Sequence, residues 1–372
     1  MANPKVVLNT GTRFIINELL KWFSLLFKTD LLYPPNYISI RLTRRCNLRC
    51  LQCECWRIKN ASEFSTNQWK DVILDIKSYI GPYFLRFYGG EPFLRSDLLE
   101  LIRFCFCNDI TTFITTNGTL INKSVADELA KNDVAQISIS LDGFKEKTHD
   151  RLRGAEGTYR KVMQAIENLR GKVDLQINTT IMRDNLDEIL DLTDFAIKNK
   201  LKISFQGYNN KIYRKYDSEK KKSDGSVLED QDWFNHCDLK KLDYVVDRLT
   251  EMKKYNKVII DPCNHFKRLK LYYHRSSKLK KMYCEAIGRQ LMIKDKGDIT
   301  LCSFCSFPIG SIGNISKNSF KDVWTSKEAA AKKNKMLRCK ETDCLVIRGC
   351  YKEGYFEKIA KIKNYFFGSG PS

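Results

Sequence analysis

Three closely spaced cysteines near the start of the chain are the residues best suited to chemistry. Cys46, Cys50 and Cys53 are separated by three and then two residues. Thiolates are the preferred ligands of iron–sulfur clusters, and a short loop can place several of them around one cluster. Three protein ligands leave one iron of a 4Fe–4S cluster open, and an open position is what metal catalysis needs. The alternative is a structural zinc site with Cys55 as the fourth ligand.

The cysteine content of the whole chain also favours metal binding. Fourteen cysteines are far more than is usual for 372 residues. The sequence does not open with the charged segment, apolar run and cleavage site of a secretory signal, so we expect a cytoplasmic protein. Thiols stay reduced there, and many cysteines then indicate metal ligands rather than disulfides.

Alternating apolar runs and helical patterns must position these cysteines. Six short runs rich in Ile, Phe, Thr and Tyr predict strands at 37–42, 84–88, 111–115, 135–141, 175–181 and 202–206. The stretches between them predict helices at 66–80, 96–107, 122–131, 157–170 and 186–199. This order predicts a parallel sheet with right-handed crossovers, in which ligands bind at the carboxyl ends of the strands. The first cysteine group directly follows the first strand.

This combination resembles the radical S-adenosylmethionine (SAM) superfamily, whose signature loop has the spacing of Cys46, Cys50 and Cys53. The resemblance implies a partial (βα)6 TIM-like barrel over residues 37–206. It also implies that the open iron binds the amino and carboxylate groups of SAM. One electron, from a donor such as ferredoxin or flavodoxin, would then cleave SAM to a 5′-deoxyadenosyl radical that abstracts a substrate hydrogen atom.

Residues after the second strand extend the resemblance. Gly89, Gly90, Glu91 and Pro92 match the GGEP motif of the family. The glycines would let the backbone approach the cofactor, and Glu91 would accept hydrogen bonds from the methionyl amino group.

Further cofactor contacts are implied at the later strand ends. The resemblance places Asn117 at the end of the third strand, Ser140 on the ribose and Arg153 on the SAM carboxylate. Many members have an aromatic residue before the third cysteine, where this chain has Gln52, so Trp56 is expected to supply the apolar contact to adenine instead.

The C-terminal cysteines resemble the SPASM and twitch extensions of this superfamily. The short segments at 312–315 and 322–324 match sequences found in those extensions. The pattern at 294–302 predicts a β-hairpin with its turn at 296–297. Gly354 stands where a full SPASM extension has another cysteine, so we expect one auxiliary 4Fe–4S cluster in a small α+β domain. Its expected ligands are Cys284, Cys302, Cys344 and Cys350, with Cys339 and Cys305 as substitutes. Two incompletely ligated clusters and a structural zinc are the alternatives.

The chain therefore divides into five predicted segments. They are an N-terminal amphipathic extension at 1–36, the radical SAM core at 37–206, a basic region on the substrate side at 207–283, the SPASM/twitch-like domain at 284–367 and a tail at 368–372. No apolar run in the chain reaches the length of a membrane span. The segment at 14–27 has an amphipathic pattern with charged residues, which predicts a helix packed on the following domain or, alternatively, in contact with a membrane surface.

The charge of the chain bears on its substrate. A net charge of +20 favours an acidic peptide or a phosphorylated substrate. We expect a peptide modified after its synthesis, and the alternatives are a phosphorylated sugar, a nucleotide or a membrane lipid. Basic and aromatic residues interleave at 265–283, which raises a zinc-stabilised nucleic-acid-binding protein as an alternative of another class. It ranks lower because no stretch resembles a known RNA-binding module.

Overall fold

A computed structural model describes residues 33–53, 55–57, 63–208, 234, 236–278, 283–284, 290–301, 310–337, 339 and 352–353, together with residues 16 and 20. Apart from those two residues, the predicted N-terminal amphipathic helix lies outside the described residues, as does the tail. Cys302, Cys305, Cys344 and Cys350 lie outside them too.

The first half of the chain alternates strands and helices as predicted. The strands are β1 (Tyr37–Thr43), β2 (Phe84–Gly89), β3 (Thr111–Thr116), β4 (Gln136–Ser140), β5 (Leu175–Ile181) and β6 (Lys202–Gly207). The helices are α2 (Thr66–Ile80), α3 (Leu98–Cys107), α4 (Lys123–Lys131), α5 (Glu146–Arg153), α6 (Thr158–Leu169) and α7 (Ile189–Lys198). Short 3-10 helices are η1 (Cys55–Arg57), η2 (Pro92–Leu94) and η3 (Arg183–Glu188). Helix α5 was not predicted, because its eight residues are strongly polar and carry little apolar periodicity.

The second half of the chain adds shorter elements. They are α9 (His236–Tyr255), α10 (Cys263–Tyr273), β7 (Tyr283–Cys284), β8 (Leu291–Ile293), β9 (Asp298–Thr300), β10 (Gly313–Asn314), α11 (Phe320–Thr325), α12 (Lys327–Leu337) and β11 (Lys352–Glu353). The predicted hairpin is confirmed: β8 and β9 pair antiparallel, and Gly297 in the turn has φ +86°. Within the described part of the chain, no helix is both long and apolar enough to cross a membrane.

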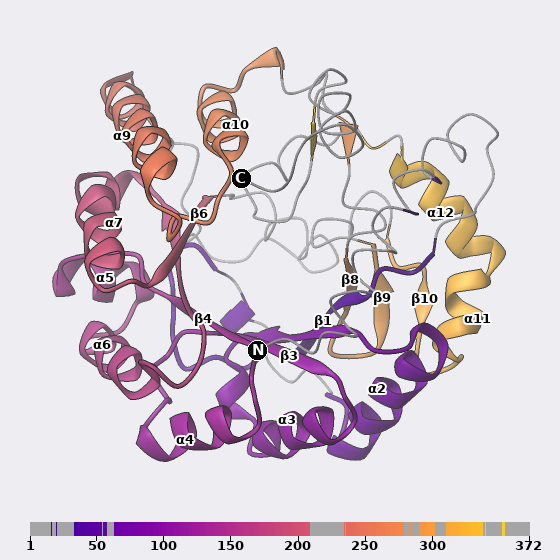
Figure 1. Cartoon of the computed structure of the whole chain (residues 1–372). Coiled ribbons are helices and arrows are strands. Elements are labelled where there is room, and N and C mark those ends of the chain that lie inside the picture. The colour runs from indigo at the N-terminus through magenta and orange to yellow at the C-terminus, as the bar shows by residue number, and fades with distance from the viewer. Residues whose placement is uncertain are drawn as a thin grey trace.

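Strands β1 to β6 form a parallel sheet in sequence order, and the helices cover its outer face (Figure 1). Beyond β1, the same sheet continues through β8, β9 and β10. Beyond β6, Ile203 forms a parallel bridge with Ile259, so the segment at 258–260 covers that edge. The result confirms a partial barrel, and it places the C-terminal hairpin directly beside the strand that leads into the cysteine loop.

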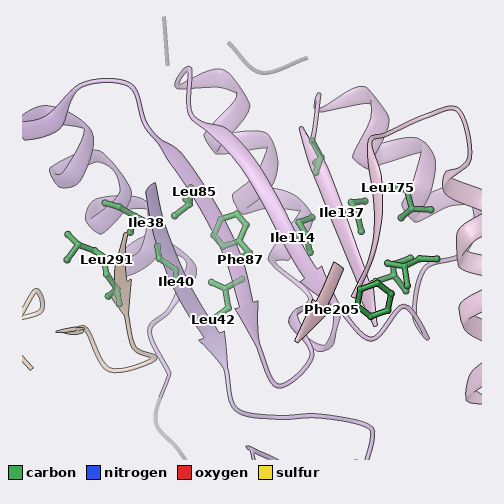
Figure 2. Packing of buried hydrophobic residues seen from close by; sticks show 14 of the residues in the cluster. Ile38, Ile40, Leu42, Leu85, Phe87, Ile114, Ile137, Leu175, Phe205 and Leu291 are labelled. Carbon is green, nitrogen blue, oxygen red and sulfur yellow. The ribbon is translucent and has the colours of Figure 1, made fainter. Parts of the chain in front are cut away.

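Alternation along the strands separates two faces of the sheet. Ile38, Ile40 and Leu42 of β1 are fully buried and belong to the same apolar cluster as Leu85 and Phe87 of β2 (Figure 2). Because this cluster includes the inner faces of the surrounding helices, the alternate residues of each strand face the inside of the barrel.

Helix α2 illustrates how local sequence sets these elements. Ser65 and Gln68 form a reciprocal capping box, in which Gln68 N donates to Ser65 Oγ and Ser65 N donates to Gln68 Oε1 at 2.8 Å. The helix ends at Gly81, whose φ of +73° suits glycine and whose N–H donates to Lys77 O.

A buried ion-pair cluster joins β1 to the C-terminal hairpin. Asp295, between β8 and β9, has no exposed surface. It accepts from Arg41 Nε at 2.8 Å and from Arg44 Nε at 2.9 Å. Burial raises the pKa of Asp295, but the charge of Arg41 and the hydrogen bond from Arg44 outweigh it, so the pKa is lowered overall.

Candidate cluster and cofactor site

The cysteine loop lies at the carboxyl end of β1, as predicted. Cys50 is buried, whereas Cys46 and Cys53 are half-buried. Two backbone hydrogen bonds fix the loop to the end of α5: Arg49 N donates to Arg153 O at 3.2 Å, and Leu51 N donates to Leu152 O at 3.0 Å. The loop is therefore held from outside its own sequence.

Burial changes the acidity of the loop thiols. It raises the pKa of Cys46 to about 11 and also raises the pKa of Cys50. The hydrogen bond with Cys55 and burial together raise the pKa of Cys53. These thiols therefore hold their protons at neutral pH, and ligation of a metal would release them.

Among the described residues, no three His, Cys, Asp or Glu side chains converge on a point where one metal ion would be held. A 4Fe–4S cluster binds each thiolate through a different iron, so its ligands need not converge in that way.

Gly89 and Gly90 are required by the neighbouring backbone. Gly90 N donates to Thr43 O and Glu91 N donates to Arg45 O, both at 2.8 Å. A Cβ on Gly90 would lie 2.1 Å from Arg45 O, and one on Gly89 would lie 2.2 Å from Thr43 O. The two glycines let the end of β2 pack directly on the start of the cysteine loop.

Glu91 is fully buried, and its carboxylate is held by the protein itself. Its Oε1 accepts from Thr116 Oγ1 at 2.8 Å and from Phe93 N at 3.1 Å, and its Oε2 accepts from Asn117 N at 2.8 Å. Burial raises the pKa of Glu91 to about 7, although these hydrogen bonds act in the opposite direction. The predicted contact with a methionyl amino group would use the remaining capacity of Oε2.

Asn117 links this carboxylate to the cysteine loop. Its backbone N–H reaches Glu91, while its Nδ2 donates to Asn47 Oδ1 at 2.8 Å and lies 4.0 Å from Cys46 Sγ. The structure thus brings Glu91, Asn117 and Cys46 together, as the sequence predicted for residues at adjacent strand ends.

Asp142, just beyond the end of β4, is a second buried carboxylate at this edge. Its Oδ1 accepts from Thr180 N at 2.8 Å, and its Oδ2 accepts from Gln52 Nε2 at 2.8 Å and pairs with Arg153 Nη2 at 2.6 Å. His149 Nδ1 accepts from Asp142 N at 3.2 Å, and burial lowers the pKa of His149 to about 3, so this ring is neutral. No local sequence pattern singled out Asp142, because its partners lie far from it along the chain.

Two buried polar atoms beside Asp142 have no hydrogen-bond partner in the described part of the chain. They are Arg153 Nε, a donor, and Gln52 Oε1, an acceptor. A carboxylate needs donors and an ammonium needs acceptors. The chemistry of this unsatisfied pair therefore fits the amino-acid end of SAM.

The other predicted cofactor residues occupy different positions around the loop. Ser140 is the last residue of β4 and is half-buried, opposite Asn178 of β5. Trp56 lies in η1, where its ring is 5.2 Å from the guanidinium carbon of Arg49.

Residues 265–273 of the basic and aromatic stretch lie in helix α10. Phe266, Tyr272 and Tyr273 are buried, and Tyr273 Oη donates to Ile181 O at 2.6 Å. Lys270 pairs with Asp247 of α9 at 2.9 Å. The three aromatic rings of α10 are thus buried and not presented for base stacking.

Strand β7 places one predicted auxiliary ligand. Cys284 is paired antiparallel with Lys352 of β11, which follows Cys350 by two positions in the sequence. Cys339 is half-buried and packs at the margin of the main apolar cluster.

Two segments of the chain match known protein families. Residues 40–196 match the radical SAM superfamily, and residues 284–351 match SPASM, an iron–sulfur cluster-binding domain. The chain therefore contains a radical SAM domain and a SPASM domain. The first implies a 4Fe–4S cluster and SAM as cofactors, and the second implies a further iron–sulfur cluster.

Curated relatives match mainly over the core. AdoMet-dependent heme synthase from Methanosarcina barkeri is 36% identical over 166 residues, which are 44% of this chain and 47% of the relative. Mycofactocin maturase MftC from Mycolicibacterium smegmatis is 32% identical over 167 residues, covering 44% of this chain and 42% of the relative. The chain thus spans about half or less of the length of these relatives.

Solved structures match over more of the chain. The structure of Streptococcus suis SuiB bound to S-adenosylmethionine aligns with a TM-score of 0.63 and 23% identity, covering 90% of this chain and 76% of SuiB. SuiB bound to its precursor peptide SuiA aligns with a TM-score of 0.61 and 24% identity, covering 90% and 75%. At identities below 25%, these similarities establish the fold alone.

Proposed function

We propose that Cys46, Cys50 and Cys53 bind the SAM-cleaving cluster and that the enzyme modifies a peptide. When bound, the reduced cluster supplies the electron that cleaves SAM. The protein holds the cysteine loop through α5 and the GGEP segment, and it offers Arg153 Nε and Gln52 Oε1 to the amino-acid end of SAM.

The inner wall of the barrel is the observation that carries the peptide proposal. At the carboxyl half of β4 to β6, the residues that alternate with the apolar core are polar: Ser138, Ser140, Asn178, Thr180, Ser204 and Gln206. Gln206 Nε2 donates to Thr180 Oγ1 at 3.1 Å, so part of this wall is already ordered by hydrogen bonds. A wall rich in amide and hydroxyl groups suits a peptide backbone better than an apolar lipid chain.

Two further observations support the same proposal. MftC is named a maturase, and SuiB has been solved with a precursor peptide. The net charge of +20 favours an acidic peptide over a neutral one. We also propose Cys284, Cys302, Cys344 and Cys350 as the auxiliary ligands and a ferredoxin or flavodoxin as the electron donor.

Metal content tests the cluster assignment. After anaerobic reconstitution, we expect about eight irons per chain and formation of 5′-deoxyadenosine with dithionite, as two 4Fe–4S clusters would give. Replacing Cys46, Cys50 and Cys53 together with Ala should leave roughly four irons, the content of one such cluster, and abolish SAM cleavage. Stoichiometric zinc without deoxyadenosine would contradict the assignment.

A substrate panel tests the peptide assignment. The reconstituted enzyme is incubated with SAM, reductant and, in turn, short peptides encoded beside its gene, nucleoside triphosphates, sugar phosphates and lipid vesicles. A peptide should stimulate SAM cleavage and change in mass. A nucleotide, sugar phosphate or lipid that does so in its place would refute the proposal.

A matched pair of variants locates the peptide site. Gln206→Leu, at the carboxyl end of β6, should raise the KM for the peptide. Gln136→Leu, at the amino end of β4, should not, because Gln136 Nε2 only bonds Asp174 at 2.9 Å on the surface far from the cysteine loop. Equal effects of the two variants would argue against binding at the carboxyl edge.

A further inference from the structure

Arg153 is more constrained than a simple cofactor-binding arginine. Its side chain is buried, Nη2 pairs with Asp142 at 2.6 Å, and Nη1 lies 3.9 Å from Cys50 Sγ. Only Nε is without a partner among the described residues. Two of the three guanidinium nitrogens are therefore directed within the protein, and one of these points at a cysteine of the cluster loop.

The backbone around Arg153 holds it in this position. Arg49 N donates to Arg153 O, and Gly154 packs so closely that a Cβ there would lie 2.3 Å from Arg49 O. Arg153 thus contacts the cysteine loop twice, through its main chain at Arg49 and through its guanidinium at Cys50.

Asp142 fixes the guanidinium from the other side. It is fully buried, and Thr180 N holds one of its oxygens at 2.8 Å. Because Nη2 contacts the buried Asp142 while Nη1 lies against Cys50 Sγ, two nitrogens of the planar guanidinium are restrained together, and Arg153 has little freedom to leave Cys50.

We propose that Asp142 is a positioning residue that holds Arg153 against Cys50, and that this N–H···S contact raises the reduction potential of the cluster bound there. Hydrogen bonds to the sulfur ligands and nearby positive charge both favour the reduced cluster, which carries one more negative charge. The inference rests on Cys50 being a cluster ligand and is independent of the substrate.

Redox titration of the reconstituted full-length enzyme tests the proposal. The signal followed is the electron paramagnetic resonance of the reduced cluster that changes when SAM is added, which separates it from the auxiliary cluster. Arg153→Met should lower the ratio of reduced to oxidised cluster about tenfold at fixed potential, equivalent to about 59 mV for one electron. Arg153→Lys should also lower it, since one ammonium cannot contact Asp142 and Cys50 together as the fork does.

Arg151→Met is the matched control. Arg151 lies on the same helix but is half-exposed and pairs with Asp184 at 3.0 Å, away from the cysteines. Its ratio should equal that of the unmodified enzyme. An unchanged ratio of reduced to oxidised cluster in both Arg153 variants would overturn the proposal. Loss of iron from both variants would also overturn it, because Arg153 would then only hold the loop in place.

A double-mutant cycle tests the role of Asp142. Asp142→Asn is measured alone and in the Arg153→Met background. If Asp142 acts through Arg153, the change in the reduced-to-oxidised ratio should differ at least threefold between the two backgrounds. Equal changes would overturn the positioning role. Persistence of the SAM-sensitive signal in Cys50→Ala would instead show that the ligand assignment is wrong.

Discussion

Replacing Asp295 with Asn should weaken the attachment of the C-terminal hairpin to the barrel. Asp295 is fully buried between Arg41 and Arg44, whose side chains are 9% and 20% exposed. Asn keeps the shape and one acceptor oxygen but removes the counter-charge of two arginines. Breaking a buried ion pair costs about 3–5 kcal/mol, so we expect a loss of about 3 kcal/mol in the free energy of unfolding, with part of the hydrogen bonding retained.

Urea denaturation of anaerobic samples, followed by tryptophan fluorescence, measures this loss. Trp324 of α11 is buried in the C-terminal region and contributes to this signal. The control is Asp174→Asn, which breaks the exposed pair with Lys202, whose side chains are 39% and 44% exposed. An exposed pair contributes about 0–1 kcal/mol. If the two variants differ by less than about 0.5 kcal/mol, the reasoning from burial is wrong.

The pH dependence gives an independent check on Asp295. Its folded-state pKa lies below the unfolded value of about 3.9, so its contribution is complete above that pH and is lost as pH falls through the folded value. The difference in stability between the unmodified protein and Asp295→Asn should therefore shrink only below about pH 4.

Two further predictions concern the edge that carries the cysteines. Gly154→Ala should reduce the iron bound by the loop, because the added Cβ would lie 2.3 Å from Arg49 O. Gly157→Ala is the control, since Gly157 has a similar φ of +72° but a Cβ there would have nothing within 4 Å. It should lower the free energy of unfolding by only about 1 kcal/mol. Glu91 has a folded-state pKa of about 7, above its unfolded value, so its ionisation destabilises the metal-free chain as pH rises from about 4.5 through 7. Glu91→Gln should therefore flatten that part of the plot of stability against pH, measured by urea denaturation at a series of pH values.

Local patterns account for much of what could be predicted. The six strands begin and end within a residue or two of the predicted positions, because each is a short run of β-branched or aromatic residues bounded by polar or turn-forming residues. The cysteine spacing and the GGEP segment are contiguous, so their chemistry is readable without a fold. Helix α5 was missed for the opposite reason: it is polar, and its stability comes from Asp150, Arg153 and Gly154 contacting other segments.

The cofactor chemistry could be inferred from local sequence features, because three thiols with this spacing and the motifs at successive strand ends need only a parallel sheet to converge. The residues that surround them could be seen only in the folded chain. Arg41 and Asp295 are 254 positions apart, and Asp142 meets Gln52 across 90 positions. Pairings at such separations depend on how β8 packs beside β1 and how α5 packs on the cysteine loop. No periodicity encodes that packing, since it arises from desolvation and close approach in the folded chain.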